Sequence, residues 1–258
     1  MKRLRFGLAL LFLWCAVFAS ASAASDAAHV YELRTYTTPA GKLDALLARF
    51  RDHTVGLFEK HGMANVGYWV PADAKDGGKN TLIYLLEHKS RAAAAASWQA
   101  FRADPEWKEV NKKSTANGPL VTKVVSVFLA PTDYAKPMTA GSKRGGAPRV
   151  FELRTYTAPE GKLSALDARF RDHTLDLFAK HGITNLGYFH PIDPEQGAGN
   201  TLIYFLAHSS HEAAAASWKK FRADPEWKKA LTASEKNGKL TTKVVSVFLT
   251  PVDFSEIK

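Results

Sequence analysis

The chain carries nearly the same sequence twice. Residues 30–134 and 150–254 align without a gap at an offset of 120 residues, so that Arg34 aligns with Arg154 and Trp107 with Trp227. Most of the paired positions hold the same residue. A unit of this length is too long for a solenoid repeat and has the size of a duplicated domain.

Each repeat begins with a predicted strand and a long amphipathic helix. Residues 30–36 alternate apolar with polar residues and are rich in β-forming types, as are residues 150–156. From residue 42 to residue 61 the apolar residues recur at helical spacing, and Gly62 gives a stop signal.

Four further elements follow in each repeat. Residues 66–70 and 81–86 read as two strands joined by a segment rich in turn residues, and residues 92–101 as a second helix. Asp104 and Pro105 predict the N-cap and first turn of another helical segment, and residues 123–129 predict the last strand. The pattern is β-α-β-β-α-β, the ferredoxin-like order.

The strands at 82–86 and 124–128 are apolar at nearly every position, which predicts that both of their faces are buried. Helices can cover only one face of such a sheet. We therefore expect an α+β fold in which the two βαββαβ repeats pack sheet to sheet, as an intramolecular dimeric α+β barrel.

The N-terminus has the three regions of a signal peptide. Basic residues lie at positions 2–5, an apolar run at 6–18 and small residues at 20–23, which predicts cleavage after Ala23 and export to the periplasm or secretion. The apolar run is shorter than the roughly 20 residues of a membrane-spanning helix, so no stable membrane anchor is expected after cleavage. Cleavage would also remove Cys15, the single cysteine.

We expect a first repeat over residues 24–134, an exposed linker over 135–149 and a second repeat over 150–258. The formal net charge of +10 is scattered over the chain without a basic stripe, so nucleic acid is not an expected partner. No Cys/His spacing typical of a zinc site occurs, and neither a metal nor another cofactor is predicted.

Several motifs, each present twice, resemble the NIPSNAP family. They are the Tyr-Glu-Leu-Arg-Thr-Tyr opening at 31–36 and its copy at 151–156, a Gly-Lys-Leu helix start, a His-Gly helix end, and Phe-Arg-x-Asp-Pro-Glu-Trp at 101–107 and 221–227. The resemblance implies a dimeric α+β barrel, a superfamily that also holds small cofactor-free monooxygenases and heme enzymes. It implies no defined activity, and the eukaryotic members are linked to mitochondria and vesicle traffic.

The first strand has a polar and an apolar face. Glu32, Arg34 and Tyr36 share one face, because side chains alternate along a strand. If the apolar face meets the helices, the polar face points toward the space between the two sheets. There, Glu32 and Arg34 would form an ion pair that fixes how the repeats register, or Arg34 and Arg154 would hold an anionic or carbonyl-bearing ligand.

The residues expected to line a ligand pocket are Arg34, Tyr36, Tyr68, Tyr84 and His88, with their copies Arg154, Tyr156, Tyr188, Tyr204 and His208. An ordinary core with satisfied hydroxyl groups would show the same pattern. His53 and His173 fall beside the apolar stripe of the first helix and are expected to be half-buried. Each is either a structural histidine or a general base.

Three functions are compatible with this sequence. The first is an exported protein that binds a small organic ligand in the barrel. The second is a cofactor-independent monooxygenase or isomerase, with His53 or His173 as proton acceptor. Arg34 and Tyr84, or their copies Arg154 and Tyr204, would polarise a carbonyl. The third is a protein-interaction scaffold. If one repeat alone is an active site, His190, His208 and His211 favour the second one. Oligomerisation beyond the pseudo-dimer stays open.

Overall fold

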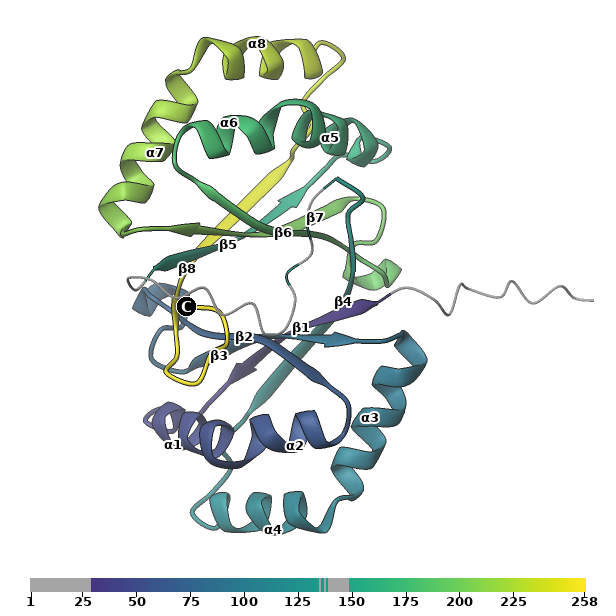
Figure 1. Ribbon diagram of the computed structural model, residues 1–258, viewed down its shortest axis with the longest axis vertical. Helices are drawn as coiled ribbons and strands as arrows, with labels where there is room; N and C mark the ends of the chain where they lie inside the picture. The colour runs from purple at the N-terminus through teal and green to yellow at the C-terminus, as the bar shows by residue number, and fades with distance from the viewer. Residues whose placement is uncertain (1–28, 135, 137, 139–148) are drawn as a thin grey trace, which may run out of the picture.

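The computed structural model describes residues 29–134, 136, 138 and 149–258 (Figure 1). The first repeat contains β1 (Val30–Thr37), α1 (Leu43–Arg49), a π-helical turn (Phe50–Thr54), α2 (Val55–Lys60), β2 (Ala64–Pro71), β3 (Thr81–His88), α3 (Arg91–Ala103), α4 (Pro105–Ser114) and β4 (Lys123–Pro131). The predicted order of elements is confirmed. The predicted signal peptide lies outside the described residues.

The second repeat has the same elements in the same order. They are β5 (Val150–Thr157), α5 (Leu163–Arg169), a π-helical turn (Phe170–Thr174), α6 (Leu175–Lys180), β6 (Thr184–Pro191), β7 (Thr201–His208), α7 (His211–Ala223), α8 (Pro225–Ser234) and β8 (Lys243–Pro251). A short 3-10 helix lies before β3, at Ala74–Asp76, and another before β7, at Pro194–Gln196.

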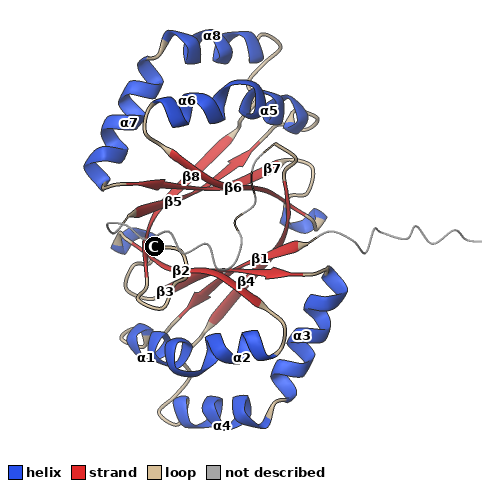
Figure 2. Cartoon of the chain, viewed as in Figure 1, coloured by secondary structure: helices blue, strands red, loops and turns tan. Residues whose placement is uncertain are grey.

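Eight antiparallel strands close into one barrel in the order β1-β3-β2-β8-β5-β7-β6-β4. Within each repeat the strands pair over most of their length, whereas β2–β8 and β4–β6 pair only near their ends, as at Trp69 with Pro251 and Leu129 with Pro191. The helices lie outside the barrel, those of each repeat against its own sheet (Figure 2). The expected α+β barrel of two ferredoxin-like repeats is confirmed.

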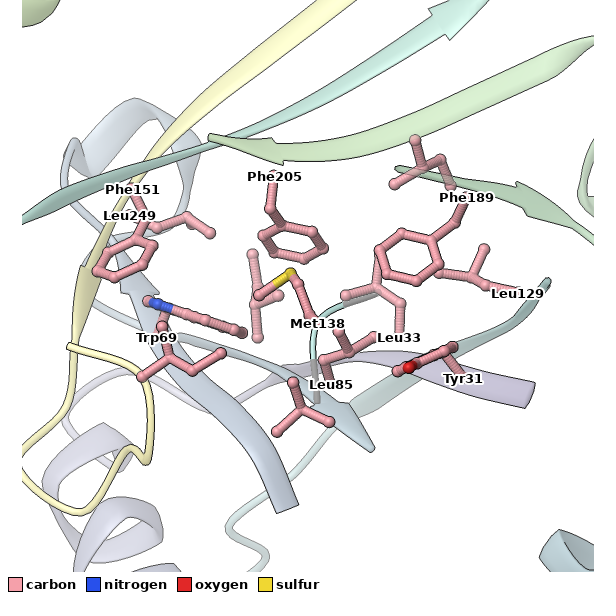
Figure 3. Packing of buried hydrophobic residues seen from close by; sticks show 14 of the residues in the cluster. Tyr31, Leu33, Trp69, Leu85, Leu129, Met138, Phe151, Phe189, Phe205 and Leu249 are labelled. Atoms are coloured by element: carbon pink, nitrogen blue, oxygen red, sulfur yellow. The ribbon is translucent and has the colours of Figure 1, made fainter. Parts of the chain in front are cut away.

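The inner faces of the two sheets form one apolar core (Figure 3). Leu33 and Trp69 of the first repeat pack with Phe151 and Phe205 of the second, and Trp69 is fully buried. The apolar face of the first strand therefore turns inward. Our expectation that the polar face meets the space between the sheets is wrong, because that space is filled by apolar side chains, which offer a charged group no hydrogen-bond partners.

The prediction of an exposed linker is wrong at Met138. Its side chain is buried in the inner core instead of exposed, beside Gly187 of β6. A Cβ atom on Gly187 would lie 2.7 Å from the Met138 Cγ, so the glycine makes room for this contact. Residues 135, 137 and 139–148 of the predicted linker lie outside the described residues.

The chain that follows β4 and β8 attaches each repeat to the other one. After β8, Asp253 accepts hydrogen bonds from Arg51 at 2.8 and 3.0 Å, and after β4, Asp133 accepts them from Arg171 at 2.7 and 3.0 Å. The backbone amide of Val252 also donates to the carbonyl of Tyr68 at 3.1 Å. Each repeat is thus completed by a segment of its neighbour.

Candidate functional site

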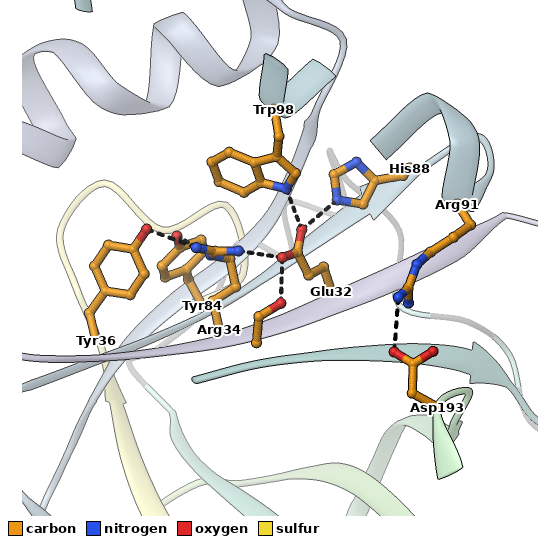
Figure 4. Close-up of polar contacts among 9 residues, drawn as sticks. Glu32, Arg34, Tyr36, Tyr84, His88, Arg91, Trp98 and Asp193 are labelled. Atoms are coloured by element: carbon orange, nitrogen blue, oxygen red, sulfur yellow. Dashed lines mark hydrogen bonds and ion pairs between the residues drawn. The ribbon is translucent and has the colours of Figure 1, made fainter. Parts of the chain in front are cut away.

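A buried carboxylate organises the layer between β1 and α3. Glu32 is 1% exposed, and four donors share its two oxygens (Figure 4). Oε1 accepts from Arg34 and from the Ser126 hydroxyl at 2.6 Å, and Oε2 accepts from the Trp98 indole at 2.7 Å and from the His88 Nε2–H at 3.1 Å. The ion pair predicted between Glu32 and Arg34 exists, but it lies within one repeat and cannot set the register of the two.

The hydrogen-bond donors around Glu32 keep its carboxylate ionised. Burial alone would raise the pKa of Glu32, but the hydrogen bonds from His88, Ser126 and Trp98 and the charge of Arg34 outweigh it and lower the pKa to about 2. Glu32 is therefore ionised at neutral pH, and the buried negative charge is balanced by the guanidinium of Arg34.

Arg34 joins this carboxylate to two tyrosines. Its Nε donates to the Tyr84 hydroxyl at 2.8 Å and its Nη2 to the Tyr36 hydroxyl at 3.1 Å, while the guanidinium lies 4.3 Å from the ring centroid of Trp98. Burial raises the pKa of Tyr84 well above its usual value, so the phenol stays protonated. We call Glu32, Arg34, Tyr36, Tyr84, His88, Trp98 and Ser126 the Glu32 cluster.

A cleft of about 340 Å³ lies over the Glu32 cluster, between β1, β4 and α3. It is lined by Glu32, Arg34, Arg91, Ala95, Trp98, Arg102, Ser126 and Phe128. The Arg91 guanidinium stacks on the Phe128 ring, 3.7 Å from its centroid, and binds Asp193 of the second repeat at 2.9 Å (Figure 4). The cleft thus combines cationic groups with aromatic walls.

The second repeat reproduces the cluster but not the rim. Glu152 accepts hydrogen bonds from Arg154, from Ser246 at 2.6 Å, from Trp218 at 2.9 Å and from His208 at 3.0 Å. The position of Arg91 is taken by His211, whose ring lies 4.9 Å from that of Phe248. The two copies share their buried groups and differ where a ligand would enter.

The structure brings most of the predicted pocket residues together. Arg34, Tyr36, Tyr84 and His88 belong to the Glu32 cluster, and their copies Arg154, Tyr156, Tyr204 and His208 to its duplicate. Tyr68 and Tyr188 instead stack on Tyr84 and Tyr204 within the core, and their hydroxyls donate to Asn65 and Asn185.

The predicted histidine base lies elsewhere. His53 is exposed, not half-buried, and lines a groove between α1 and α4 that shares no residue with the cleft over Glu32. His173 is exposed in the same way. The reason is the π-helical turn at Phe50–Thr54, which changes the phase of the helix so that Thr54 takes the buried position.

His190 also lies apart from the cluster. Its Nδ1 lies 2.8 Å from the carbonyl oxygen of Thr201 and its Nε2 lies 3.2 Å from Asp167. Although burial lowers the pKa of His190, these two acceptors outweigh it and raise the pKa above its usual value. Of the three histidines that favoured the second repeat, His208 alone joins the carboxylate cluster.

Sequence reasoning missed six residues of the cleft as site residues. They are Arg91, Ala95, Trp98, Arg102, Ser126 and Phe128. Ser126 carries a usable signal, because it is the one polar residue within the apolar run at 124–128 and is paired in register with Arg34. A hydroxyl in such a strand indicates a buried partner that needs a donor.

We expect folding stability to fall in acid because of the two buried carboxylates. The pKa of Glu32 and of Glu152 is about 2 in the folded chain, against an ordinary value of 4.5. A lowered folded-state pKa gives stability that is complete above the unfolded pKa and is lost as pH falls, here between about pH 5 and pH 2. Melting temperatures measured from pH 7 to pH 2 should fall continuously below about pH 5.

The matched control is the double variant Glu32→Gln with Glu152→Gln, which lacks both titrating groups. Its melting temperature should be lower at neutral pH and should depend less steeply on pH below 5. An equally steep acid dependence in the double variant would assign the effect to other carboxylates, such as Asp104 and Asp224, whose pKa is also lowered by hydrogen bonds from neighbouring Lys and His side chains.

The described residues contain neither a candidate membrane-spanning helix nor a candidate metal site. None of the helices in the described part of the chain is long and apolar enough to cross a membrane. Residues 29–134, 136, 138 and 149–258 also contain no group of three His, Cys, Asp or Glu side chains that could hold a metal ion.

The closed barrel of two ferredoxin-like halves defines the class of dimeric α+β barrels. A candidate monooxygenase from Fusobacterium nucleatum has the same fold, with a TM-score of 0.56 at 10% identity over 88% of this chain and 94% of its own. An anthrone oxidase-like protein has a TM-score of 0.51 at 16% identity over 88% and 93%. Identities this low show a common fold only.

The sequence comparison identifies the family. The NIPSNAP family model matches residues 31–136 and again residues 151–256. The chain therefore belongs to the NIPSNAP family, with two copies of its domain. The NipSnap homolog of Dictyostelium discoideum is 27% identical over 184 residues, which are 71% of this chain and 71% of that protein.

Proposed function

We propose that this NIPSNAP chain is an exported binding protein whose first repeat holds a small aromatic anion in the cleft over the Glu32 cluster. The observation that carries the proposal is the charge of the cleft. Arg34 is paired with Glu32, and Arg91 is paired with Asp193. Arg102 is the remaining cation and gives the lining a net positive charge. The rings of Trp98 and Phe128 provide apolar walls beside these cations.

The protonation states of the lining favour binding over acid–base catalysis. Glu32 stays ionised with a pKa of about 2, and the arginines stay charged at any physiological pH. A general base works best with a pKa near the working pH, and the pKa of Glu32, the carboxylate of the lining, lies far below it. The lining arginines are cationic hydrogen-bond donors, which is what recognition of an anion needs.

The barrel interior is a less suitable place for this ligand. We expected the ligand between the two sheets, but side chains such as Trp69, Phe151 and Phe205 pack there into one core. The cleft over Glu32 lies on the outer side of the sheet, next to the exposed side chains of Arg91 and Arg102. A ligand can therefore reach it without any rearrangement of the barrel.

The cleft is tested by titration with 2-naphthoate, followed by tryptophan fluorescence. We expect Arg102→Ala to weaken binding roughly tenfold, because one charge-assisted contact is lost. Arg222→Ala, the same change in the second repeat, should leave the affinity unchanged. Equal affinities of the wild-type chain and Arg102→Ala, or no saturable binding at all, would reject the cleft as the binding site.

Export is tested separately from binding. The full chain, produced in a bacterial host, should be recovered from the periplasmic or extracellular fraction with a new N-terminus at Ala24. An intact N-terminus and a cytoplasmic location would reject export and leave the binding proposal standing.

An oxygenase is the second candidate function, favoured by the names of the two fold relatives. The anthrone oxidase-like protein suggests anthrones as the substrate class to test. Anthrone and O₂ give anthraquinone and water, so the reaction needs no other reductant. The assay is oxygen uptake with anthrone, compared with heat-denatured protein. Uptake no faster than with the denatured chain would leave the binding protein as the function.

A further inference from the structure

Arg49 is a buried cation without a carboxylate partner. It lies in the last turn of α1 and is 7% exposed. Its Nη1 donates to two neutral acceptors, the Asn111 Oδ1 at 3.2 Å and the Ser114 Oγ at 3.3 Å, and its buried Nε has no hydrogen-bond partner. Among the described residues, none of the Asp and Glu side chains lies within ion-pair distance of Arg49.

In the second repeat the corresponding arginine has a carboxylate partner. Arg169, the copy of Arg49, is 5% exposed, and its Nη1 binds the Glu235 carboxylate at 3.0 Å. The residue of the first repeat that corresponds to Glu235 is Thr115. One repeat therefore supplies a carboxylate to this arginine from its own chain, and the other does not.

An unpaired buried charge is costly to a folded protein. Burial lowers the pKa of Arg49, yet a guanidinium remains protonated in proteins, so the charge persists. The aromatic face of Trp107, with its ring centroid 5.1 Å from the guanidinium carbon, offsets part of this cost. A carboxylate brought by a ligand would offset the rest, as Glu235 does in the second repeat.

Arg49 lines a groove of about 690 Å³ between α1 and α4. Its apolar lining comes from Ala45, Ala48, Val110 and Leu120. Three acidic side chains also line it: Glu106 is bound to Lys60 at 3.1 Å, Glu109 to Lys113 at 3.3 Å, and Asp52 is exposed. An apolar groove with one buried, unpaired cation matches an amphiphile with a single negative head group.

We infer that this groove binds an unbranched fatty acid, whose carboxylate occupies beside Arg49 the place that the Glu235 carboxylate occupies beside Arg169. The alkyl chain lies along the alanine-lined wall between α1 and α4. This site is separate from the cleft over Glu32 and does not depend on the function proposed for it. The second repeat lacks the site because its own carboxylate fills it.

The experiment is isothermal titration calorimetry of dodecanoate into the mature chain, residues 24–258. We expect one site per chain in the wild type. Thr115→Glu, which copies the second repeat, should weaken binding at least tenfold, since its carboxylate competes intramolecularly for Arg49. Glu235→Thr, which copies the first repeat, should raise the stoichiometry to two sites per chain.

Thr115→Gln is the matched control, because it adds the same bulk without the charge and should bind closer to the wild type than Thr115→Glu does. Far-UV circular dichroism shows whether each variant is folded. The inference is overturned if the wild type does not bind dodecanoate, or if Thr115→Glu and Thr115→Gln bind equally. Arg102→Ala should leave dodecanoate binding unchanged, which separates this site from the cleft over Glu32.

Discussion

Replacing Glu32 by alanine is expected to lower the free energy of unfolding by about 3–5 kcal/mol, the usual cost of removing one partner of a buried ion pair. The carboxylate accepts hydrogen bonds from Arg34, Ser126, Trp98 and His88. Its loss leaves these donors without their acceptor and Arg34 without its counter-charge. Few other single changes disconnect so many buried polar groups at once.

The measurement is urea denaturation followed by tryptophan fluorescence. Ser126→Ala serves as the control, because it removes one hydrogen bond to the ionised carboxylate and leaves the ion pair with Arg34 in place, which should cost about 1.5–3 kcal/mol. The double variant Glu32→Ala with Arg34→Met should recover part of the stability, since it removes both charges. If Glu32→Ala costs no more than Ser126→Ala, the cluster does not stabilise the fold as its geometry indicates.

The second large effect is expected at the contact between the two sheets. Trp69→Ala should cost about 3–5 kcal/mol, the range for a buried large aromatic residue. The ring is fully buried and lies 5.8 Å from that of Phe151 and 5.3 Å from that of Phe205, both in the other repeat. The substitution would open a cavity where both sheets contribute side chains.

Trp69→Phe is the matched control, because phenylalanine stands at the corresponding position 189 of the second repeat. It should cost clearly less than Trp69→Ala. The Trp69 indole nitrogen is buried without a hydrogen-bond partner, so its removal offsets part of the lost packing. Equal losses in the two variants, measured by the same urea titration, would contradict a packing role for the ring.

The repeat and its periodicities were sufficient to predict the barrel, but not which way the first strand faces. Alternation separates Glu32, Arg34 and Tyr36 from Tyr31 and Leu33, and both orientations satisfy that pattern. The choice depends on Trp98, His88 and Ser126, which are distant in sequence and meet Glu32 only in the fold. The polar face therefore lies under the helices.

The candidate sites were predicted only in part, for a similar reason. Arg34 is predicted from the polar face of the first strand and Tyr84 from its place on a middle strand. The exposure of His53, in contrast, depends on a π-helical turn that helical spacing does not reveal. No feature of the sequence indicates that Arg49 belongs to a binding site. The difference between Thr115 and Glu235 is visible in the aligned repeats, but its meaning requires the α1–α4 contact.

The segments after β4 and β8, which carry Asp133 and Asp253 across to the opposite repeat, have a consequence for assembly. In a dimer of separate chains such exchanged contacts weaken on dilution, whereas here both partners belong to one molecule. The pseudo-dimer should therefore have the same melting temperature at nanomolar as at micromolar protein. The two halves are also free to diverge, since a substitution in one is not imposed on the other.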